Sequence, residues 1–390
     1  MVVTRGCSGF TLAELLVAMA VTVVALGLVA SLVRPVSMAF QSLPEAADAQ
    51  QRLRVAVQRL TEDVTGAGAG PVSGWAARAV PAWPAVLPCR WGGEPLGTRP
   101  EGCAQHDAIT AVTMPFAAPQ AMLADDLAPP AGALRVAPVS GCALSHAACR
   151  FRADARVIVA DDSGAWDLVP VSAVSSDGLV LDHAAAPVTR PYRAGAPVGE
   201  ARSSAYSLRL DPATRAFQLR RAADGAPDMP FLDHVASLRF EYFGRADPPA
   251  VIDDDDPVRR RAAYGALPPP AGVDDTLDAW PAGENCHVFR LDGLPLPRQA
   301  ALPTGADGLA ALPASLFTDG PWCPDGASLN RYDADLLRIR LVRVVIRIQA
   351  QSPAVRGLDA SVFAAPGGGR DAARFVPDLE VRVDAAIRNR

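Results

Sequence analysis

The strongest pattern in the chain is an apolar run near its N-terminus. No side chain from Leu15 to Val33 carries a formal charge, and Glu14 stands directly before this run. A helix from Phe10 to Val33 would be roughly 36 Å long at about 1.5 Å per residue, enough to cross a bilayer. A carboxylate in a membrane-length helix is costly, so Glu14 is a candidate functional residue. The pattern predicts a transmembrane helix at residues 10–33, after a short polar segment at residues 1–9.

A second helical pattern, at residues 34–66, follows the apolar run. Its apolar positions recur every three or four residues and form one stripe: Leu53, Val57, Leu60 and Val64. Alternating glycines from Gly66 to Gly70 predict the end of this helix. Pro35 predicts a bend or an interruption, and Ser42-Leu43-Pro44-Glu45 predicts a capping box that restarts the helix. The two helical patterns therefore predict a long N-terminal helix in two halves.

Beyond residue 67 the hydrophobic period changes to two, which is typical of strands with one wet face. The predicted strands are 108–114, 155–160, 168–174, 179–181, 206–210, 217–220, 238–242, 338–349 and 379–387. Turn residues at Ser175–Gly178 and Asp211-Pro212 predict two hairpins. Two stretches near 70–106 and 245–332 lack this period and predict irregular insertions. The expected fold class is α+β, with the helix packed on an antiparallel sheet head at residues 67–390.

Composition limits the possible functions. The net charge is −5, so the sequence lacks the net positive charge that is typical of domains that bind nucleic acid. All 37 basic residues are Arg, because the sequence contains no Lys. This absence excludes Walker A phosphate loops, Schiff-base lysines and lysine isopeptide crosslinks. The 36 Pro and 31 Gly residues indicate that much of the chain lies in loops.

Cysteine usage agrees with an exported head. Cys7 lies in the polar leader, and six cysteines follow: Cys89, Cys103, Cys142, Cys149, Cys286 and Cys323. In an oxidising compartment these cysteines would form disulfides that hold the long loops. Fifteen connectivities exist, and sequence order favours Cys89 with Cys103, Cys142 with Cys149, and Cys286 with Cys323. The alternative is a zinc site around Cys142, His146 and Cys149, but no CxxC pair accompanies these residues.

One acidic cluster offers a weak metal candidate. Asp253, Asp254, Asp255 and Asp256 stand directly before an Arg-rich segment. A solvated loop explains this pattern, and calcium binding is the alternative because hard cations prefer carboxylates. The ligand spacing of an EF-hand loop is absent, so the sequence predicts no metal site with defined geometry and no cofactor.

No catalytic motif accompanies these features. The chain contains neither a GxSxG elbow nor an HExxH pair, and its five His residues are scattered along the sequence. The expectation is therefore that the protein is not an enzyme.

The leader supports a specific family. Ser8-Gly9-Phe10-Thr11-Leu12-Ala13-Glu14 resembles the class III signal of type IV prepilins and pseudopilins, in which the small residue at the cleavage site precedes the apolar run. The resemblance implies that prepilin peptidase cleaves between Gly9 and Phe10 and methylates Phe10. It also implies that Glu14, at the fifth mature position, pairs with the N-terminal amine of a neighbouring subunit during assembly.

Two segments of the body sharpen the resemblance. Residues 231–244 and 381–389 resemble PilW-type minor pilins, which are related to the GspJ minor pseudopilin of type II secretion. The resemblance implies a single-pass inner-membrane protein with a periplasmic head that later joins a surface pilus. Its implied partners are prepilin peptidase, other minor pilins, the major pilin and the inner-membrane assembly platform, and its implied role is in a tip or priming complex. A secretion pseudopilin and a pilus-associated adhesin or ligand-binding module are the alternatives.

Overall fold

The structure is a computed structural model of the 390-residue chain. It describes residues 11–68, 84–88, 107–115, 118–129, 131–139, 149–160, 166–183, 188, 191–224, 226–247, 288–291, 294–297, 301–313, 316–317, 334–369 and 375–387. The chain divides into two compact units. Unit 1 contains residues 1–52 and 348–379, and unit 2 contains residues 53–347 and 380–390.

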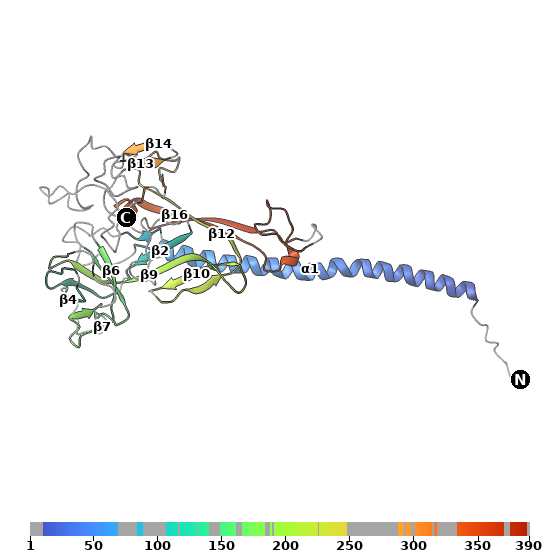
Figure 1. Ribbon diagram of the computed structural model, residues 1–390, viewed down its shortest axis with the longest axis horizontal. Helices are drawn as coiled ribbons and strands as arrows, with labels where there is room; N and C mark the ends of the chain where they lie inside the picture. Colours follow the sequence, from blue (N-terminus) through green and yellow to red (C-terminus); the bar gives the residue numbers. More distant parts are fainter. Residues whose placement is uncertain are drawn as a thin grey trace. The chain divides into compact units, whose positions relative to one another are not determined.

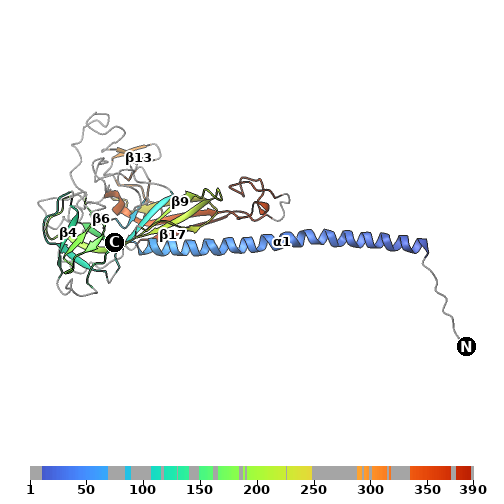
Figure 2. The same cartoon turned by 60° about the horizontal axis from the view of Figure 1, so that its bottom comes forward.

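The N-terminal region forms one continuous helix, α1, from Leu12 to Gly66 (Figures 1 and 2). The predicted interruption at Pro35 and the predicted restart at Ser42–Glu45 are therefore wrong. Each proline removes only one backbone hydrogen bond, and the helical turns on both sides keep theirs. The predicted end of the helix is confirmed, because the chain turns at Ala67 and Gly68, where Gly68 has a φ of 70°.

Unit 1 pairs the first part of α1 with a folded segment near the C-terminus. We call residues 349–369 and 375–378 the strap; it contains the short helix η3, Pro353–Val355. The Glu45 carboxylate accepts hydrogen bonds from the backbone N–H groups of Gln351 and Ser352. Ala46 packs against the small apolar cluster of the strap: Ala350, Val355 and Val376. Glu45 thus satisfies strap backbone groups instead of capping a new helix.

The strap is tightly built around glycines. A Cβ atom at Gly367 would collide with the carbonyl oxygens of Pro353 and Arg356, and one at Gly357 would lie 2.5 Å from the Phe375 ring. The Phe363 and Phe375 rings pack edge to face, with centroids 5.6 Å apart. These approaches require residues without a side chain, so the glycine-rich sequence specifies the shape of the strap.

In unit 2, α1 continues with a buried stripe at helical spacing. Leu53, Leu60 and Val64 are buried as predicted. The buried residue at the centre of the stripe is Ala56 and not the predicted Val57. Val57 is only half-buried and lies at the edge of the stripe. Gly68 donates a backbone hydrogen bond of 2.9 Å to the Val112 carbonyl oxygen. The part of α1 from Leu53 to Gly66 is therefore bound to the sheet of this unit.

The described part of unit 2 contains an eleven-stranded antiparallel sheet. Its main path runs β1 (Val86–Leu87), β2 (Ala108–Thr113), β9 (Pro197–Leu210), β3 (Gln120–Leu123), β4 (Ala133–Pro138), β8 (Val180–Asp182) and β7 (Ala173–Val174). Off this path, β5 (Arg156–Ala160) pairs with β9 and β6 (Trp166–Pro170), and β10 (Phe217–Ala223) pairs with β9 and β11 (Met229–Leu232).

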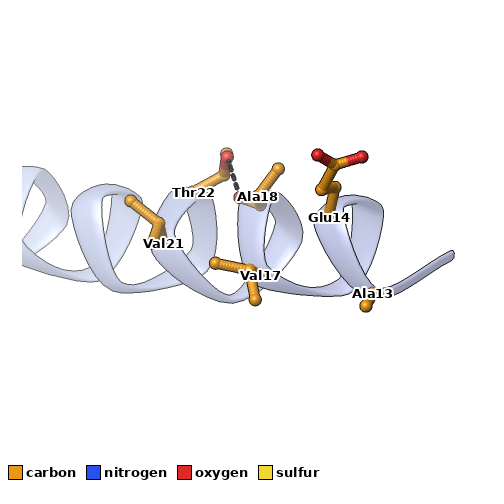
Figure 3. Close-up of a pocket in the computed structure, with 6 residues that line it drawn as sticks. All are labelled: Ala13, Glu14, Val17, Ala18, Val21 and Thr22. Carbon is orange, nitrogen blue, oxygen red and sulfur yellow. Dashed lines mark hydrogen bonds between the residues drawn. The ribbon is translucent and has the colours of Figure 1, made fainter. Parts of the chain in front are cut away.

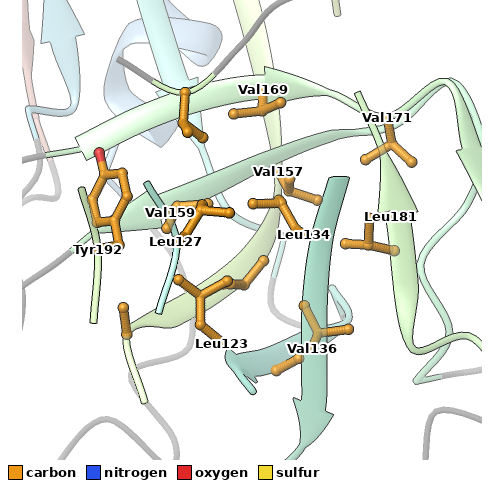
Figure 4. Packing of buried hydrophobic residues seen from close by; sticks show 14 of the residues in the cluster. Leu123, Leu127, Leu134, Val136, Val157, Val159, Val169, Val171, Leu181 and Tyr192 are labelled. Atoms are coloured by element: carbon orange, nitrogen blue, oxygen red, sulfur yellow. The ribbon is translucent and has the colours of Figure 1, made fainter. Parts of the chain in front are cut away.

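The long strand β9 organises this sheet. Its first half pairs with β3 and β5, and its second half pairs with β2 and β10. The first half contributes Val198 to a core cluster that also includes residues of β3, β4, β5, β6 and β8 (Figure 4). Ten labelled side chains of this cluster are Leu123, Leu127, Leu134, Val136, Val157, Val159, Val169, Val171, Leu181 and Tyr192.

A second, four-stranded sheet has the order β15 (Ala310–Leu312), β12 (Val235–Gly244), β16 (Ile339–Ile348) and β17 (Leu379–Ala386). Across its polar face the Arg343 guanidinium donates two hydrogen bonds to Asp384, at 2.7 and 2.9 Å. The Arg343 guanidinium also lies 4.7 Å from the centroid of the Phe243 ring. A two-stranded sheet pairs β13 (Val288–Leu291) with β14 (Leu294–Pro297).

The predicted strands are confirmed in position, with two differences: the strand predicted at 206–210 begins nine residues earlier as β9, and the segment 168–174 is divided between β6 and β7. Both predicted hairpins are present: β7 pairs with β8 across Ser175–Gly178, and β9 pairs with β10 after Asp211. The structure adds short strands that the period of two did not predict, including β1 within 70–106 and three strands within 245–332. A long helix with a large antiparallel sheet confirms the α+β class and fits a pilin-like arrangement.

Candidate functional site

Glu14 lies in the first turn of α1 and is held by its own chain. One oxygen of its carboxylate, Oε2, accepts hydrogen bonds from the Thr11 backbone N–H and the Thr11 hydroxyl, both at 2.9 Å. In return, the Glu14 N–H donates to the Thr11 hydroxyl oxygen at 3.3 Å. This reciprocal pair is a capping box, which satisfies N–H groups that lack partners at a helix start. The T-x-x-E spacing carried this signal, although our sequence reasoning missed it.

The helix that carries Glu14 is long and apolar enough to cross a membrane. Its candidate span is Leu12–Ser31, and the side chains of this span are exposed in the structure. Large side chains along it, such as Leu12 and Val23, are 78% and 66% exposed. So much continuous apolar surface requires lipid or an apolar partner. Glu14 is the sole ionisable residue of this span.

A shallow groove runs along the helix beside Glu14. It is lined by Ala13, Glu14, Val17, Ala18, Val21 and Thr22 (Figure 3). Glu14, Ala18 and Thr22 follow one another along one side of the helix. The Thr22 hydroxyl donates a hydrogen bond of 2.7 Å to the Ala18 carbonyl oxygen, so it is already satisfied within the helix. Among the groove residues, Glu14 alone offers a charge for which an incoming cationic group could compete.

Most other sequence candidates lie outside the described residues. These are Gly9 and Phe10, the cysteines Cys89, Cys103, Cys142, Cys286 and Cys323, and the acidic cluster Asp253, Asp254, Asp255 and Asp256. Cys149 is described and is buried, with 7% of its surface exposed. Cleavage, disulfide pairing and calcium binding therefore stay predictions. Within the described ranges, no three His, Cys, Asp or Glu residues are grouped so that they could hold a metal ion.

Sequence reasoning also missed a polar cluster between α1 and the eleven-stranded sheet of unit 2. The Asp63 carboxylate accepts hydrogen bonds from the Tyr206 hydroxyl at 2.8 Å and from Arg221 at 3.0 and 3.1 Å. It also forms an ion pair with Arg59, one turn earlier on the helix, at 3.2 Å. Tyr206 and Arg221 are cross-strand neighbours on β9 and β10. This cluster joins helix to sheet, so it is structural.

Comparison with known proteins gives one match, at the N-terminus. Residues 4–30 match the family model described as the prokaryotic N-terminal methylation motif. This match covers residues 4–9 of the leader, Glu14 and the candidate membrane span as far as residue 30. No curated protein and no solved structure matches the chain. The motif supports a type IV pilin-like family for this chain and indicates a precursor that prepilin peptidase processes before assembly with other pilins.

Proposed function

We propose that this protein is a minor type IV pilin that is cleaved between Gly9 and Phe10, methylated at Phe10 and incorporated into a pilus. The observation that carries the proposal is the methylation motif at an exposed, membrane-length span, Leu12–Ser31, whose sole charge is Glu14. The large head favours a minor subunit, which acts with other minor pilins in a tip or priming complex. In this role the protein has no catalytic activity of its own.

Glu14 is the residue on which incorporation depends. Its Oε2 atom is engaged by Thr11, whereas its Oε1 atom has no intrachain hydrogen bond among those found for the described residues. A neighbouring subunit's terminal amine can pair with this second oxygen without dismantling the capping box. Such pairing offsets the cost of placing either charge in an apolar setting. The capping box thus presents a preoriented carboxylate to the incoming subunit.

The main test is the location and chemistry of the N-terminal peptide. Filaments are sheared from the native host, and mass spectrometry reads this peptide in the filament and membrane fractions. We expect a terminus at methylated Phe10 in the filament fraction. The same terminus confined to membranes would contradict the pilus role and favour a secretion pseudopilin. An intact Met1 would show that the leader is not cleaved and would contradict the proposed processing.

Two variants test the role of Glu14. Glu14→Ala removes the charge and the capping acceptor, whereas Glu14→Gln keeps an oxygen acceptor for Thr11 and removes only the charge. Both should be processed, because the helix still inserts, and both should be depleted from filaments by about tenfold or more, as expected for loss of a charge pair in an apolar setting. Wild-type incorporation of Glu14→Gln would show that the charge is unnecessary.

A further inference from the structure

The last strand, β17, is the longest edge strand in the described part of the two large sheets. It has eight residues and pairs only with β16. The other edge strands are short or contain proline: β1 and β7 have two residues each, β15 has three, and β6 and β11 include Pro170 and Pro230. Short length and proline are two common protections of an exposed edge. The strand β17 has neither of them.

The pairing of β17 with β16 determines which backbone groups point to the open edge. The Ile387 N–H donates to the Arg340 carbonyl oxygen. Three residues earlier, the Asp384 side chain binds Arg343, so the two strands are antiparallel. In an antiparallel ladder alternate residues bond to one neighbouring strand, and the residues between them point the other way. The N–H and C=O groups that point away from β16 are therefore those of residues 380, 382, 384 and 386.

These outward groups are open in the folded chain. Glu380, Arg382, Asp384 and Ala386 are exposed, whereas the residues between them are half-buried or buried. The exposure of Ala386 is informative, because a methyl group is too short to reach solvent unless the backbone beside it is accessible. Among the hydrogen bonds of the described residues, none uses the outward backbone groups of these four positions. Such a row of unpaired groups is a template for the addition of another strand.

The charged face of this sheet indicates the chemistry of the added strand. Charges alternate across three strands, because Arg343 on β16 lies 4.0 Å from Glu241 on β12 and 2.7 Å from Asp384 on β17. Charges also alternate along β17, in the order Glu380, Arg382, Asp384. A strand that continues this pattern has basic residues opposite Glu380 and Asp384 and an acidic residue opposite Arg382. The mixed signs disfavour strands whose charges do not match.

A second copy of this chain is a poorer partner than a different protein. Antiparallel pairing of β17 with its copy requires a two-fold axis normal to the sheet. The strand β17 and the part of α1 from Leu53 to Gly66 have the same lengthwise direction (Figures 1 and 2). This axis would therefore point the two α1 helices in opposite directions, and both could not enter one membrane from the same side. A parallel two-fold pair would place the charged side of one copy next to the apolar side of the other.

We propose that the outer edge of β17 binds an extended segment of a different filament subunit by strand addition. This inference rests on the proposed function, which supplies such neighbours. The bound segment pairs with the outward backbone groups of β17 and presents basic, acidic and basic residues opposite Glu380, Arg382 and Asp384. The backbone hydrogen bonds supply affinity, and the charges select the partner. The C-terminal strand thus has a role beyond completing its own sheet.

Hydrogen exchange tests whether the edge is open in the purified, detergent-solubilised full chain. The amides of residues 380, 382, 384 and 386 should exchange about a hundredfold or more faster than those of 381, 383 and 385, because only the second set bonds to β16. Equal exchange in the two sets would contradict the open edge and overturn the inference, whatever the location of the protein in the cell.

Photocrosslinking in the native host tests the partner. A photoreactive phenylalanine analogue replaces Ala386 at the edge or, as the matched control, Arg239, which is exposed on the inner strand β12. We expect crosslinks from position 386, but not from 239, to a segment of another subunit, identified by mass spectrometry of sheared filaments. This segment should carry the alternating charges that match those of β17.

Charge reversal gives a second readout of the same crosslink. Arg382→Glu should lower the crosslink yield from position 386 by about fivefold or more, because three adjacent acidic side chains then repel the partner, while Arg239→Glu should not. If the wild-type protein is in filaments but position 386 crosslinks to nothing, to β17 of a second copy, or equally well in Arg382→Glu, the inference is wrong and the proposed function stands. If the wild-type protein is absent from filaments, the proposed function fails and the inference falls with it.

Discussion

Two carboxylates on α1, those of Glu14 and Asp63, lie in different environments. This difference distinguishes a candidate assembly residue from a structural one. Glu14 is exposed and bonded only within its own helical turn, to Thr11. Asp63 has 12% of its side chain exposed and binds Tyr206 and Arg221 from the sheet of unit 2. A fully partnered carboxylate stabilises the fold, whereas one that retains an open oxygen can accept a partner from outside. This difference makes Glu14 the assembly candidate and Asp63 the structural residue.

Replacing Asp63 should destabilise the head. Asp63→Ala removes the acceptor for the buried Tyr206 hydroxyl and the partly buried Arg221, so we expect a loss of about 2–4 kcal/mol in the free energy of unfolding. Glu62→Ala is the control, since Glu62 forms only exposed contacts on the helix, with Arg59 at 3.5 Å and with Gln58 at 3.0 Å, and should change stability by less than about 0.5 kcal/mol. Urea unfolding of the detergent-solubilised full chain measures both, and equal effects would contradict the structural role of Asp63.

The same cluster predicts a delayed tyrosine titration. Burial raises the pKa of Tyr206 far above its ordinary value, and the adjacent Asp63 carboxylate raises this pKa further. Burial also raises the pKa of Tyr242. Because the folded-state pKa exceeds the unfolded one, the contribution of each group to stability is complete below about pH 10 and declines as the pH rises above that value.

Ultraviolet absorbance of tyrosinate checks this prediction. Of the five tyrosines, Tyr206 and Tyr242 should stay protonated in the folded chain at a pH where all five ionise in urea. Tyr206→Phe should remove amplitude from the late part of the titration alone. A single transition near pH 10 in the folded protein would show that these hydroxyls are accessible to water.

At the scale of elements, the strap shows how glycine determines a local shape. Gly367 donates a backbone hydrogen bond to the Gly357 carbonyl oxygen at 3.2 Å, and Gly368 donates to Pro353 at 2.8 Å. Space for a side chain differs sharply between these neighbours: a Cβ at Gly367 would strike two carbonyl oxygens, whereas one at Gly368 would meet nothing within 4 Å. Adjacent glycines thus have different structural requirements.

This contrast gives a matched pair of variants. Gly367→Ala should destabilise the strap by roughly 1–3 kcal/mol, as overpacking typically does, and Gly368→Ala should be close to neutral. Hydrogen exchange of the backbone amides in residues 350–369 is the measurement. Faster exchange in Gly367→Ala alone is expected, and similar exchange in the two variants would contradict the tight approach at Gly367.

At the scale of the whole molecule, the last strand completes a sheet whose other strands come from earlier in the chain. The strand β17 pairs with β16, and the Ile387 N–H donates to the Arg340 carbonyl oxygen at 2.8 Å. The apolar side of β16 is almost fully buried, with Val342 and Ile346 at 0% and 1% exposure. The C-terminal strand therefore protects the backbone edge of β16, a strand whose apolar side chains lie in the core.

Two truncations test this arrangement. A stop after Asp378 removes β17 and should give a head that aggregates or is readily proteolysed, because an apolar strand becomes a sheet edge. A stop after Ile387 keeps β17 and should preserve a protease-resistant head. Limited proteolysis and gel filtration in detergent distinguish them, and a resistant, monodisperse head in the shorter protein would show that β17 is dispensable.

The sequence alone determined the features that depend on near neighbours. The apolar run, the helical stripe with Leu60 and Val64, the alternating strands and the Gly178 turn follow from spacings of two to four residues. Glu14 was also visible from sequence, because a lone charge in an apolar run is conspicuous. These features are encoded locally and need no knowledge of the rest of the fold.

Tertiary structure decided what depends on distant residues. The pairing of β9 with four strands and the partners of Asp63, which lie 143 and 158 residues away, have no local signature. The continuity of α1 through Pro44 likewise became clear only with the strap in place beside Glu45. Local propensity is worth at most a few kcal/mol per site, so packing and long-range hydrogen bonds override it and settle which predicted segments meet.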